Sequence, residues 1–291
     1  MEEITGFAQA MREKALSIPA NRTELLDTCG TGGSGIHKFN ISTAAAIVAS
    51  AASVRVAKHG NRSASSKAGS ADVLEALGVN IHLNTEQAGQ CLERIGLCFL
   101  FSQLYHPSMK YVAGLRKELG LRTIFNMLGP LTNPAGADRQ LLGIYDYRLT
   151  STVAEVLREL GLSRALVVSS EEGLDEISLS SPTRIAELRD YKVTTYEITA
   201  EDLGLRSCEI EDIYGGDANC NAKIIHSIFQ GKLGPHRDIV LANAGASIYL
   251  AGLADSLQEG VFRAGKTIDS GLAEAKLGQL IHTTGGIARV S

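Results

Sequence analysis

Several features that mark whole classes of protein are missing from this sequence. Its most apolar long stretch, residues 44–57, is interrupted by Ser50, Ser53 and Arg55 and is too short to cross a bilayer. The formal net charge of -4 provides no general attraction to nucleic acid or to an anionic membrane. Residues 1–5 include acidic side chains where a secretory signal needs a basic region and an apolar core. We therefore expect no membrane span, no nucleic-acid partner and no secretion.

The usual motifs of cysteine and nucleophile chemistry are also absent. The 5 cysteines are odd in number, scattered and without a C-x-x-C pair, which argues against a disulfide framework or a zinc knuckle and favours a reducing cytoplasm. There is no G-x-S-x-G sequence for a nucleophilic serine and no P-loop. There is no tryptophan, and the rest of the composition, 44% hydrophobic and 21% charged, is typical of a globular protein. A chain of 291 residues can form one large domain or two unequal ones.

Strand-like runs alternate with helix-like runs, which predicts an α/β fold with a mostly parallel sheet covered by helices. The expected strands are residues 25–29, 54–58, 79–83, 98–101, 141–145 and 165–169. The expected helices between them are residues 41–52, 66–77, 86–95 and 150–161. Further expectations are an opening helix over 3–16, a helical insertion over 106–119 and 123–127, edge strands within 177–213, and helices from residue 218 onward.

A glycine-rich turn follows the first expected strand. Residues 27–43 read Asp-Thr-Cys-Gly-Thr-Gly-Gly-Ser-Gly-Ile-His-Lys-Phe-Asn-Ile-Ser-Thr and lead into an alanine-rich helix. Glycines let backbone amides approach a ligand closely, and a helix beginning near Asn40 adds its unpaired amides. The pattern favours an anion site, although ordinary tight turns use the same residues.

A second polar run follows the next strand. Residues 58–70 read Lys-His-Gly-Asn-Arg-Ser-Ala-Ser-Ser-Lys-Ala-Gly-Ser. In a parallel sheet both turns emerge at the same edge, where ligands bind, and two donor-rich loops suit a ligand with several phosphate groups. The alternative is a solvated turn in which Ser65 or Ser66 caps the next helix.

Three other groups of residues are candidates for ligand contacts. Asp175 and Glu176 are adjacent carboxylates after the last parallel strand and can share a hard cation such as Mg²⁺, although most acidic pairs are surface charge. Arg116 and Arg122 flank the helical insertion and can hold a carboxylate, although helix surfaces often carry arginine for solubility. The histidines other than His59 form no evident metal set and are expected at the surface or at helix ends.

Five ordered motifs resemble the anthranilate phosphoribosyltransferase family. They are Gly30-Thr-Gly-Gly-Ser, Asn40-Ile-Ser-Thr, Lys58-His-Gly-Asn-Arg-Ser, Arg122-Thr-Ile-Phe-Asn-Met-Leu-Gly-Pro-Leu-Thr-Asn-Pro and Gly173-Leu-Asp-Glu. The resemblance implies transfer of a phosphoribosyl group from phosphoribosyl pyrophosphate to anthranilate, with release of diphosphate, as a step of tryptophan biosynthesis. It also implies Mg²⁺, a cytoplasmic homodimer, and a small helical domain (1–20 and 104–134) beside an α/β domain (21–103 and 135–291).

The resemblance also implies which residues bind each ligand. Those expected around phosphoribosyl pyrophosphate are Gly30, Gly33, Ser34, Lys38, Asn40, Ser42, Thr43, Lys58, His59, Gly60, Asn61, Arg62, Ser63, Ala64, Ser65, Ser66 and Ser70. Those expected at anthranilate are Gly30, Asn61 and Arg116, and those expected at the metal are Ser42, Asp175 and Glu176. No dedicated catalytic base is expected, because positioning of the amine and stabilisation of the leaving diphosphate can carry the reaction.

The sequence departs from the family pattern in two places. Members of the family commonly have Asp at the position of Ser34 and a small hydroxyl residue at that of Lys38. We hypothesise that these two changes compensate each other. The chain also begins later than is usual for the family, which predicts a weakened or altered homodimer with exposed apolar surface near residues 4–16.

Two other functions are compatible with parts of this pattern. A pyrimidine nucleoside phosphorylase resembles the family in fold and also opens with a glycine-rich phosphate turn, but it is not expected to carry the runs at 58–63 and 122–134. A catalytically idle relative that binds nucleic acid would fit Ser34 and the short N-terminus. The net acidity and the intact Asp175-Glu176 pair argue against that second alternative.

Overall fold

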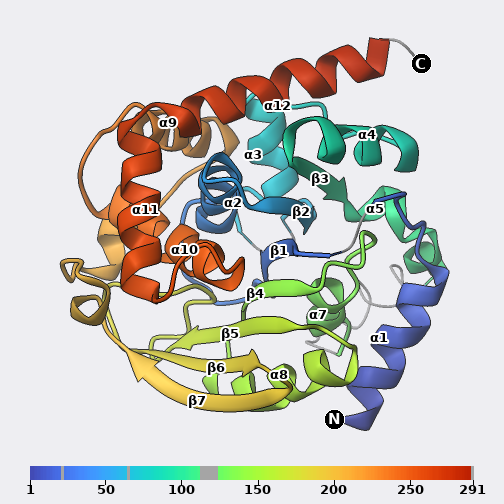
Figure 1. The fold of residues 1–291 in the computed structure, drawn as a ribbon, viewed down its shortest axis with the longest axis horizontal. Coiled ribbons are helices and arrows are strands. Elements are labelled where there is room, and N and C mark those ends of the chain that lie inside the picture. Colours follow the sequence, from blue (N-terminus) through green and yellow to red (C-terminus); the bar gives the residue numbers. More distant parts are fainter. Residues whose placement is uncertain (21–22, 64–65, 112–123, 290–291) are drawn as a thin grey trace.

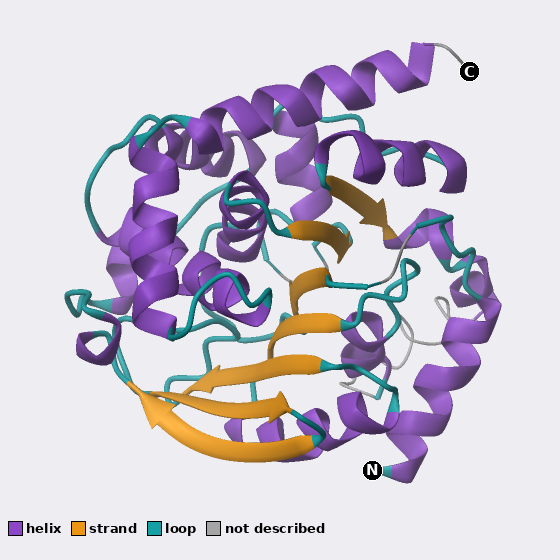
Figure 2. Cartoon of the chain, in the orientation of Figure 1, coloured by secondary structure: helices purple, strands orange, loops and turns teal. Residues whose placement is uncertain are grey.

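A sheet runs through the middle of the molecule in the computed structural model, which describes residues 1–20, 23–63, 66–111 and 124–289. Within these residues the sheet has seven strands in the order β3-β2-β1-β4-β5-β6-β7 (Figures 1 and 2). The strands are β1 Leu25–Gly30, β2 Arg55–Gly60, β3 Leu97–Phe101, β4 Arg139–Gly143, β5 Arg164–Ser170, β6 Thr183–Arg189 and β7 Lys192–Ile198. The predicted α/β fold with a mostly parallel sheet is confirmed.

The strand order places a ligand-binding position at the centre of the sheet. Strands β1 to β5 are parallel, and β6 and β7 continue as an antiparallel edge. The chain builds outward from β1 in one direction through β2 and β3, then crosses to the other side of β1 for β4 and β5. Crevices form at the carboxyl ends of strands where the winding reverses in this way. Here those ends belong to β1 and β4, whose last residues, Gly30 and Gly143, lie opposite each other.

Helices cover both faces of the sheet. The α-helices are α1 Glu2–Lys14, α2 Ile41–Ala51, α3 Ser70–Ala76, α4 Thr85–Ile95, α5 Ser102–Tyr105, α7 Phe125–Leu128, α8 Thr150–Glu159, α9 Ala218–Phe229, α10 Pro235–Leu250, α11 Leu257–Asp269 and α12 Leu272–Arg289. Short 3₁₀ turns occur at Pro107–Met109, Gly129–Leu131, Tyr147–Leu149, Glu201–Leu203 and Ile210–Ile213. None of the helices in the described ranges is long and apolar enough to cross a membrane.

The side chains of β5 show how the two faces are divided. Leu166 and Val168 belong to a large apolar cluster that includes α2 and α10. Ala165 and Val167 point the other way, into a smaller cluster with α8 and α1. Because successive side chains of a strand alternate between faces, a central strand with helices on both sides is apolar throughout. This explains why the continuous apolar runs in the sequence predicted the parallel strands.

The expected strand over 79–83 is wrong. Val79, Ile81 and Leu83 are buried, as the alternation suggested, but the segment pairs with no strand of the sheet. Its backbone is bonded instead to α3 and to side chains: the Val79 amide donates to the Leu74 carbonyl, Thr284 Oγ1 accepts from the Asn80 amide, and Tyr105 Oη donates to the Leu83 carbonyl. The alternating burial of this segment therefore arises from packing under the helices, without hydrogen bonds to a neighbouring strand.

The other sequence expectations are largely confirmed. Strands β6 and β7 lie in the 177–213 region as an antiparallel edge, and the chain is helical from α9 onward. The helix expected from residue 66 begins at Ser70. The predicted insertion over 106–119 falls mostly outside the described residues. Its described part begins with a 3₁₀ turn, and the expected helix at 123–127 corresponds to α7.

The N-terminal helix α1 packs on α7 and α8 of the same chain. Arg12 fixes it there by donating to the backbone carbonyls of Leu131 at 2.7 Å and Leu160 at 3.1 Å. Phe7 and Leu16 are about half exposed. The structure thus has apolar surface where the sequence predicted it, and the predicted weakening of a homodimer stays a prediction.

The close approach at the end of β4 predicts a specific sensitivity to Gly143→Ala. A Cβ on Gly143 would overlap the backbone carbonyl of Asp175, so the 171–176 turn would have to move. We expect the free energy of unfolding to fall by about 1–3 kcal/mol, as for other overpacked sites. Urea denaturation followed by circular dichroism measures this change.

Gly278→Ala is the matched control, because a Cβ there meets nothing within 4 Å in the middle of α12. It should be neutral or stabilising by up to about 1 kcal/mol. Equal stability of the Gly143→Ala variant and the wild type would show that the turn adjusts freely.

Candidate active site

Segments from three parts of the chain meet at the carboxyl edge of the central strands. The glycine turn follows β1, a polar loop follows β2, and the turn with Asp175 and Glu176 follows β5. The Gly32 amide donates to Asp175 Oδ2 at 2.8 Å. A Cβ on Gly30 would lie 2.5 Å from the same oxygen. The glycine turn and the acidic pair, 143 residues apart for this hydrogen bond, are therefore in direct contact.

Lys38 lies between the two carboxylates. Its Nζ is 2.8 Å from Asp175 Oδ1 and 2.8 Å from Glu176 Oε1. Both carboxylate residues are buried, at 1% and 4% exposure. Burial works to lower the pKa of Lys38, but its attraction to the carboxylates outweighs that effect and the pKa is raised. Burial raises the pKa of Glu176 against the attraction of Lys38. The sequence placed Lys38 near phosphates and gave no sign of this ion pair.

A second cation, the buried Lys58, lies beside the first turn of α2. Its Nζ donates to the Thr28 carbonyl and to Ser42 Oγ, the latter at 3.2 Å. Burial lowers the pKa of Lys58, against the attraction of nearby negative groups that include Asp27. Ser42, expected at the metal, thus has its hydroxyl oxygen engaged by an ammonium group.

Asp27 is a site residue that the sequence analysis missed. It is fully buried in β1, and its Oδ1 accepts from the His59 amide at 3.0 Å. Burial raises its pKa to about 6. The carboxylate therefore joins the ends of β1 and β2 beside Lys58. A charged residue inside an apolar strand was the available signal.

The polar loop after β2 is fastened mainly by its own side chains. Arg62 makes ion pairs of 2.6 Å with Asp72 and Glu75 of α3. Asn61 Oδ1 accepts from the Arg62 amide at 2.8 Å. Ser70 Oγ donates to the Asn61 carbonyl at 3.2 Å. The Arg62 guanidinium, expected at the phosphates, is bound to helix α3 in this structure.

Other predicted residues also have structural partners. Asn40 Nδ2 donates to the Ala68 carbonyl at 3.2 Å, and its Oδ1 accepts from Asn221 Nδ2 at 2.9 Å. This side chain therefore joins the glycine turn, the polar loop and α9. Ser34 Oγ accepts from the Ile36 amide at 3.4 Å. Thr43 Oγ1 is buried and has no hydrogen-bond partner in the part of the chain that the structure describes.

His59 and His106 form a buried pair of rings beside the polar loop. Their centroids are 5.0 Å apart, and His59 Nδ1 lies 3.1 Å from the Gly129 carbonyl, to which it donates. Burial, together with the neighbouring His106, lowers the pKa of His59 to about 3, so this ring is neutral at physiological pH. His106 follows the end of α5, as expected for a helix-end residue, but it is buried and not at the surface.

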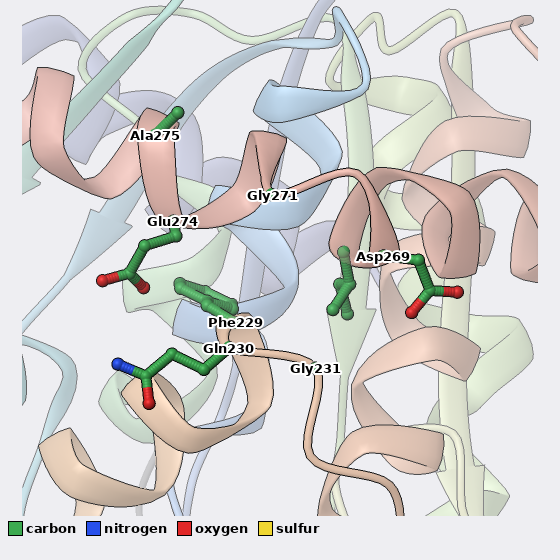
Figure 3. Close-up of a pocket in the computed structure, with 8 residues that line it drawn as sticks. Phe229, Gln230, Gly231, Asp269, Gly271, Glu274 and Ala275 are labelled. Carbon is green, nitrogen blue, oxygen red and sulfur yellow. The ribbon is translucent and has the colours of Figure 1, made fainter.

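Four predicted or quoted residues lie outside the described ones: Ala64, Ser65, Arg116 and Arg122. Among the described residues no cluster of three or more His, Cys, Asp or Glu is suited to a metal ion, so Asp175 and Glu176 are not part of a larger set of such side chains. A surface hollow of about 400 Å³ between α9, α11 and α12, shown in Figure 3, is lined by none of the site residues. The candidate site is therefore defined by the glycine turn, the polar loop and the acidic turn, which meet at the carboxyl edge of the central strands.

The buried state of His59 predicts a pH effect on stability. The folded-state pKa of about 3 lies below the ordinary value of 6.5, so the unfolded chain binds a proton that the native protein excludes. The free energy of unfolding should therefore fall as the pH drops below 6.5, and this group alone should account for a loss of about 2 kcal/mol at pH 5.

Urea denaturation of His59→Asn at pH 7 and pH 5 should show a smaller loss of unfolding free energy than in the wild type. His282→Asn, at an exposed position, should lose as much as the wild type. Identical losses in all three proteins would contradict the assignment.

Comparison with known proteins identifies the chain's relatives. Residues 22–274 match the glycosyl transferase family, a/b domain. The anthranilate phosphoribosyltransferase of Brevibacillus brevis is 56% identical over 291 residues, 100% of this chain and 85% of the relative. That of Methanobrevibacter smithii is 53% identical over 284 residues, 98% of this chain and 84% of the relative.

Solved structures agree with the sequence relatives. The crystal structure of anthranilate phosphoribosyltransferase from Thermus thermophilus superposes with a TM-score of 0.92 at 45% identity, covering 97% of this chain and 84% of that one. The Saccharomyces cerevisiae enzyme in complex with PRPP and Mg has a TM-score of 0.90 at 28% identity, covering 98% and 80%. The chain belongs to the glycosyl transferase family, and within it to the anthranilate phosphoribosyltransferases.

Proposed function

We propose that this protein transfers the phosphoribosyl group of phosphoribosyl pyrophosphate to the amine of anthranilate, giving phosphoribosylanthranilate and diphosphate in tryptophan biosynthesis. The observation that carries the proposal is the meeting of the glycine turn, the end of β2 with Lys58, and the Asp175-Glu176 pair at the end of β1. Relatives named for this activity span nearly the whole chain at 50–56% identity. Assembly as a cytoplasmic homodimer is proposed from the resemblance alone.

The residues at the end of β1 suit a diphosphate. The buried Lys58 and the partly buried Lys38 bring two cations to one place, and the glycine turn supplies backbone amides beside them. Departure of diphosphate moves negative charge onto the leaving group and leaves positive charge on the ribose. The fixed charge of Lys58 and the amides of the glycine turn can stabilise that separation without first having to reorganise.

The donor set at the acidic pair fits Mg²⁺. Two buried carboxylates supply the hard oxygen ligands that this ion prefers, and in the described part of the chain both of their ion pairs are with the same ammonium. Asp175 and Glu176 would hold the ion. When bound, Mg²⁺ would supply charge neutralisation for the diphosphate.

The proposed acceptor needs positioning more than activation. The anthranilate nitrogen is a nucleophile without deprotonation by a dedicated base, so holding it near the ribose can supply much of the rate. Asn61 and Arg116 are proposed for this contact, with Arg116 opposing the carboxylate. The neutral His59 ring cannot serve as a cationic acid at physiological pH.

The two alternative functions find less support. A pyrimidine nucleoside phosphorylase does not account for relatives at 50–56% identity that are named for transfer to anthranilate. Binding of nucleic acid has no favourable charge behind it, since the net charge is -4. Transfer to anthranilate is therefore the function that the site supports best.

Loss of anthranilate fluorescence tests the proposal. Consumption should require both phosphoribosyl pyrophosphate and Mg²⁺. Asp175→Asn should lower kcat/KM by about 100-fold or more, because it removes an oxygen ligand and a charge at the leaving group. Asp255→Asn changes an exposed carboxylate far along the chain and should leave kcat/KM as it is. Well-folded wild-type protein that consumes no anthranilate under these conditions would refute the proposed function.

A further inference from the structure

The ammonium of Lys38 has three oxygen partners on the acidic turn. In addition to the two carboxylates at 2.8 Å, its Nζ lies 3.4 Å from the Asp175 carbonyl. The contacts with Glu176 Oε1 and the Asp175 carbonyl are hydrogen bonds, and the contact with Asp175 Oδ1 is an ion pair, so a single two-residue segment holds the ammonium. Its side chain is only 17% exposed. The contact therefore differs from a loose ion pair at the surface, where two mobile side chains meet in water.

The backbone around Lys38 is held in place as well. Lys38 pairs with Tyr214 in an isolated antiparallel bridge. On either side, the Gly215 amide donates to the His37 carbonyl at 2.8 Å and the Phe39 amide donates to the Ile213 carbonyl at 3.4 Å. Removing a partner from a buried pair of this kind leaves a charge without compensation. The segment is thus positioned to deliver a cation to Asp175 and Glu176.

A divalent cation at the acidic pair would need the same oxygens. Mg²⁺ binds carboxylate oxygens at about 2.0–2.1 Å. Asp175 Oδ1 and Glu176 Oε1 are both in contact with the Lys38 Nζ. Asp175 Oδ2 is already the acceptor for the Gly32 amide. Two cations sharing these two oxygens would repel each other strongly at such short range.

We propose that Lys38 is a resident cation of the acidic pair, which competes with divalent metal ions for Asp175 and Glu176 and so sets the metal affinity of the ligand-free site. Metal enters when the ammonium withdraws. A diphosphate gives the withdrawn ammonium new anionic partners, so metal and diphosphate should bind more tightly together than separately. That last consequence rests on the proposed function, whereas the competition itself does not.

Binding of Mn²⁺ alone tests the competition without any substrate. Electron paramagnetic resonance reports free Mn²⁺ during a titration of the wild-type protein. Lys38→Met removes the charge and leaves an unbranched side chain one atom shorter, and we expect it to bind Mn²⁺ at least ten-fold more tightly than the wild type. Adding Asp175→Asn to Lys38→Met should abolish that gain.

Lys232→Met is the matched control, because it removes the charge of an exposed lysine in the loop before α10. It should bind Mn²⁺ as the wild type does. Equal Mn²⁺ affinities in the wild type and Lys38→Met would overturn the proposal. Since the assay contains neither substrate, this result would leave the proposed transfer to anthranilate untouched, and a failure of that transfer would leave the competition standing.

The wild-type protein provides a second measurement in case Lys38→Met does not fold. Crystals soaked in MnCl₂ should show anomalous density at the carboxylates of Asp175 and Glu176, with the Lys38 ammonium moved away from both. Density at the carboxylates with Lys38 still in contact with both would contradict the proposal. The proposal would also be contradicted if, at Mn²⁺ concentrations that saturate the protein in solution, the crystals showed no metal at Asp175 and Glu176 and Lys38 had not moved.

Discussion

Two buried carboxylates at the edge of the sheet are the constraint on which the rest of the site depends. Burying Asp175 and Glu176 is unfavourable unless their charge is compensated, and the compensation comes from the glycine turn, through the Gly32 amide and the Lys38 ammonium. The requirement joins segments that are far apart in the sequence. It also explains why Gly30 and Gly143 end their strands, since a side chain at either position would collide with Asp175.

The same place holds charges of both signs in close balance. Lys58, in β2, lies near the buried Asp27, and Lys38, in the glycine turn, contacts the acidic turn. A cluster of this kind suits a ligand that itself carries opposite charges, such as a diphosphate with its metal ion. The pKa values of Asp27 and Glu176 are both raised by burial. Shifted pKa values of this kind are common at binding sites, where ionisable groups are held away from water.

Much of the fold could be predicted from the sequence, because a parallel strand buried on both faces is an apolar run of recognisable length. The segment at 79–83 failed this rule, since its alternation reflects burial under helices and its backbone bonds to Thr284 and Tyr105 where a strand would bond to a neighbouring strand. The meeting of the two donor loops and the acidic pair was also expected, because parallel strands end at one edge.

The individual contacts between side chains could not be predicted from the sequence. Lys38 and Asp175 are 137 residues apart, and nothing local indicates that they touch. Likewise, Arg62 carries the charge expected at a phosphate, but its position beside α3 gives it Asp72 and Glu75 instead.

The central claim is that the turn at 27–43, the loop at 58–70 and the acidic pair form one diphosphate site. The most direct test is a crystal structure of the wild-type protein with phosphoribosyl pyrophosphate and Mg²⁺. The account predicts the diphosphate between the glycine turn and Lys58, with a magnesium ion on Asp175 and Glu176. Diphosphate bound away from these three segments, in a protein that transfers the phosphoribosyl group, would contradict it.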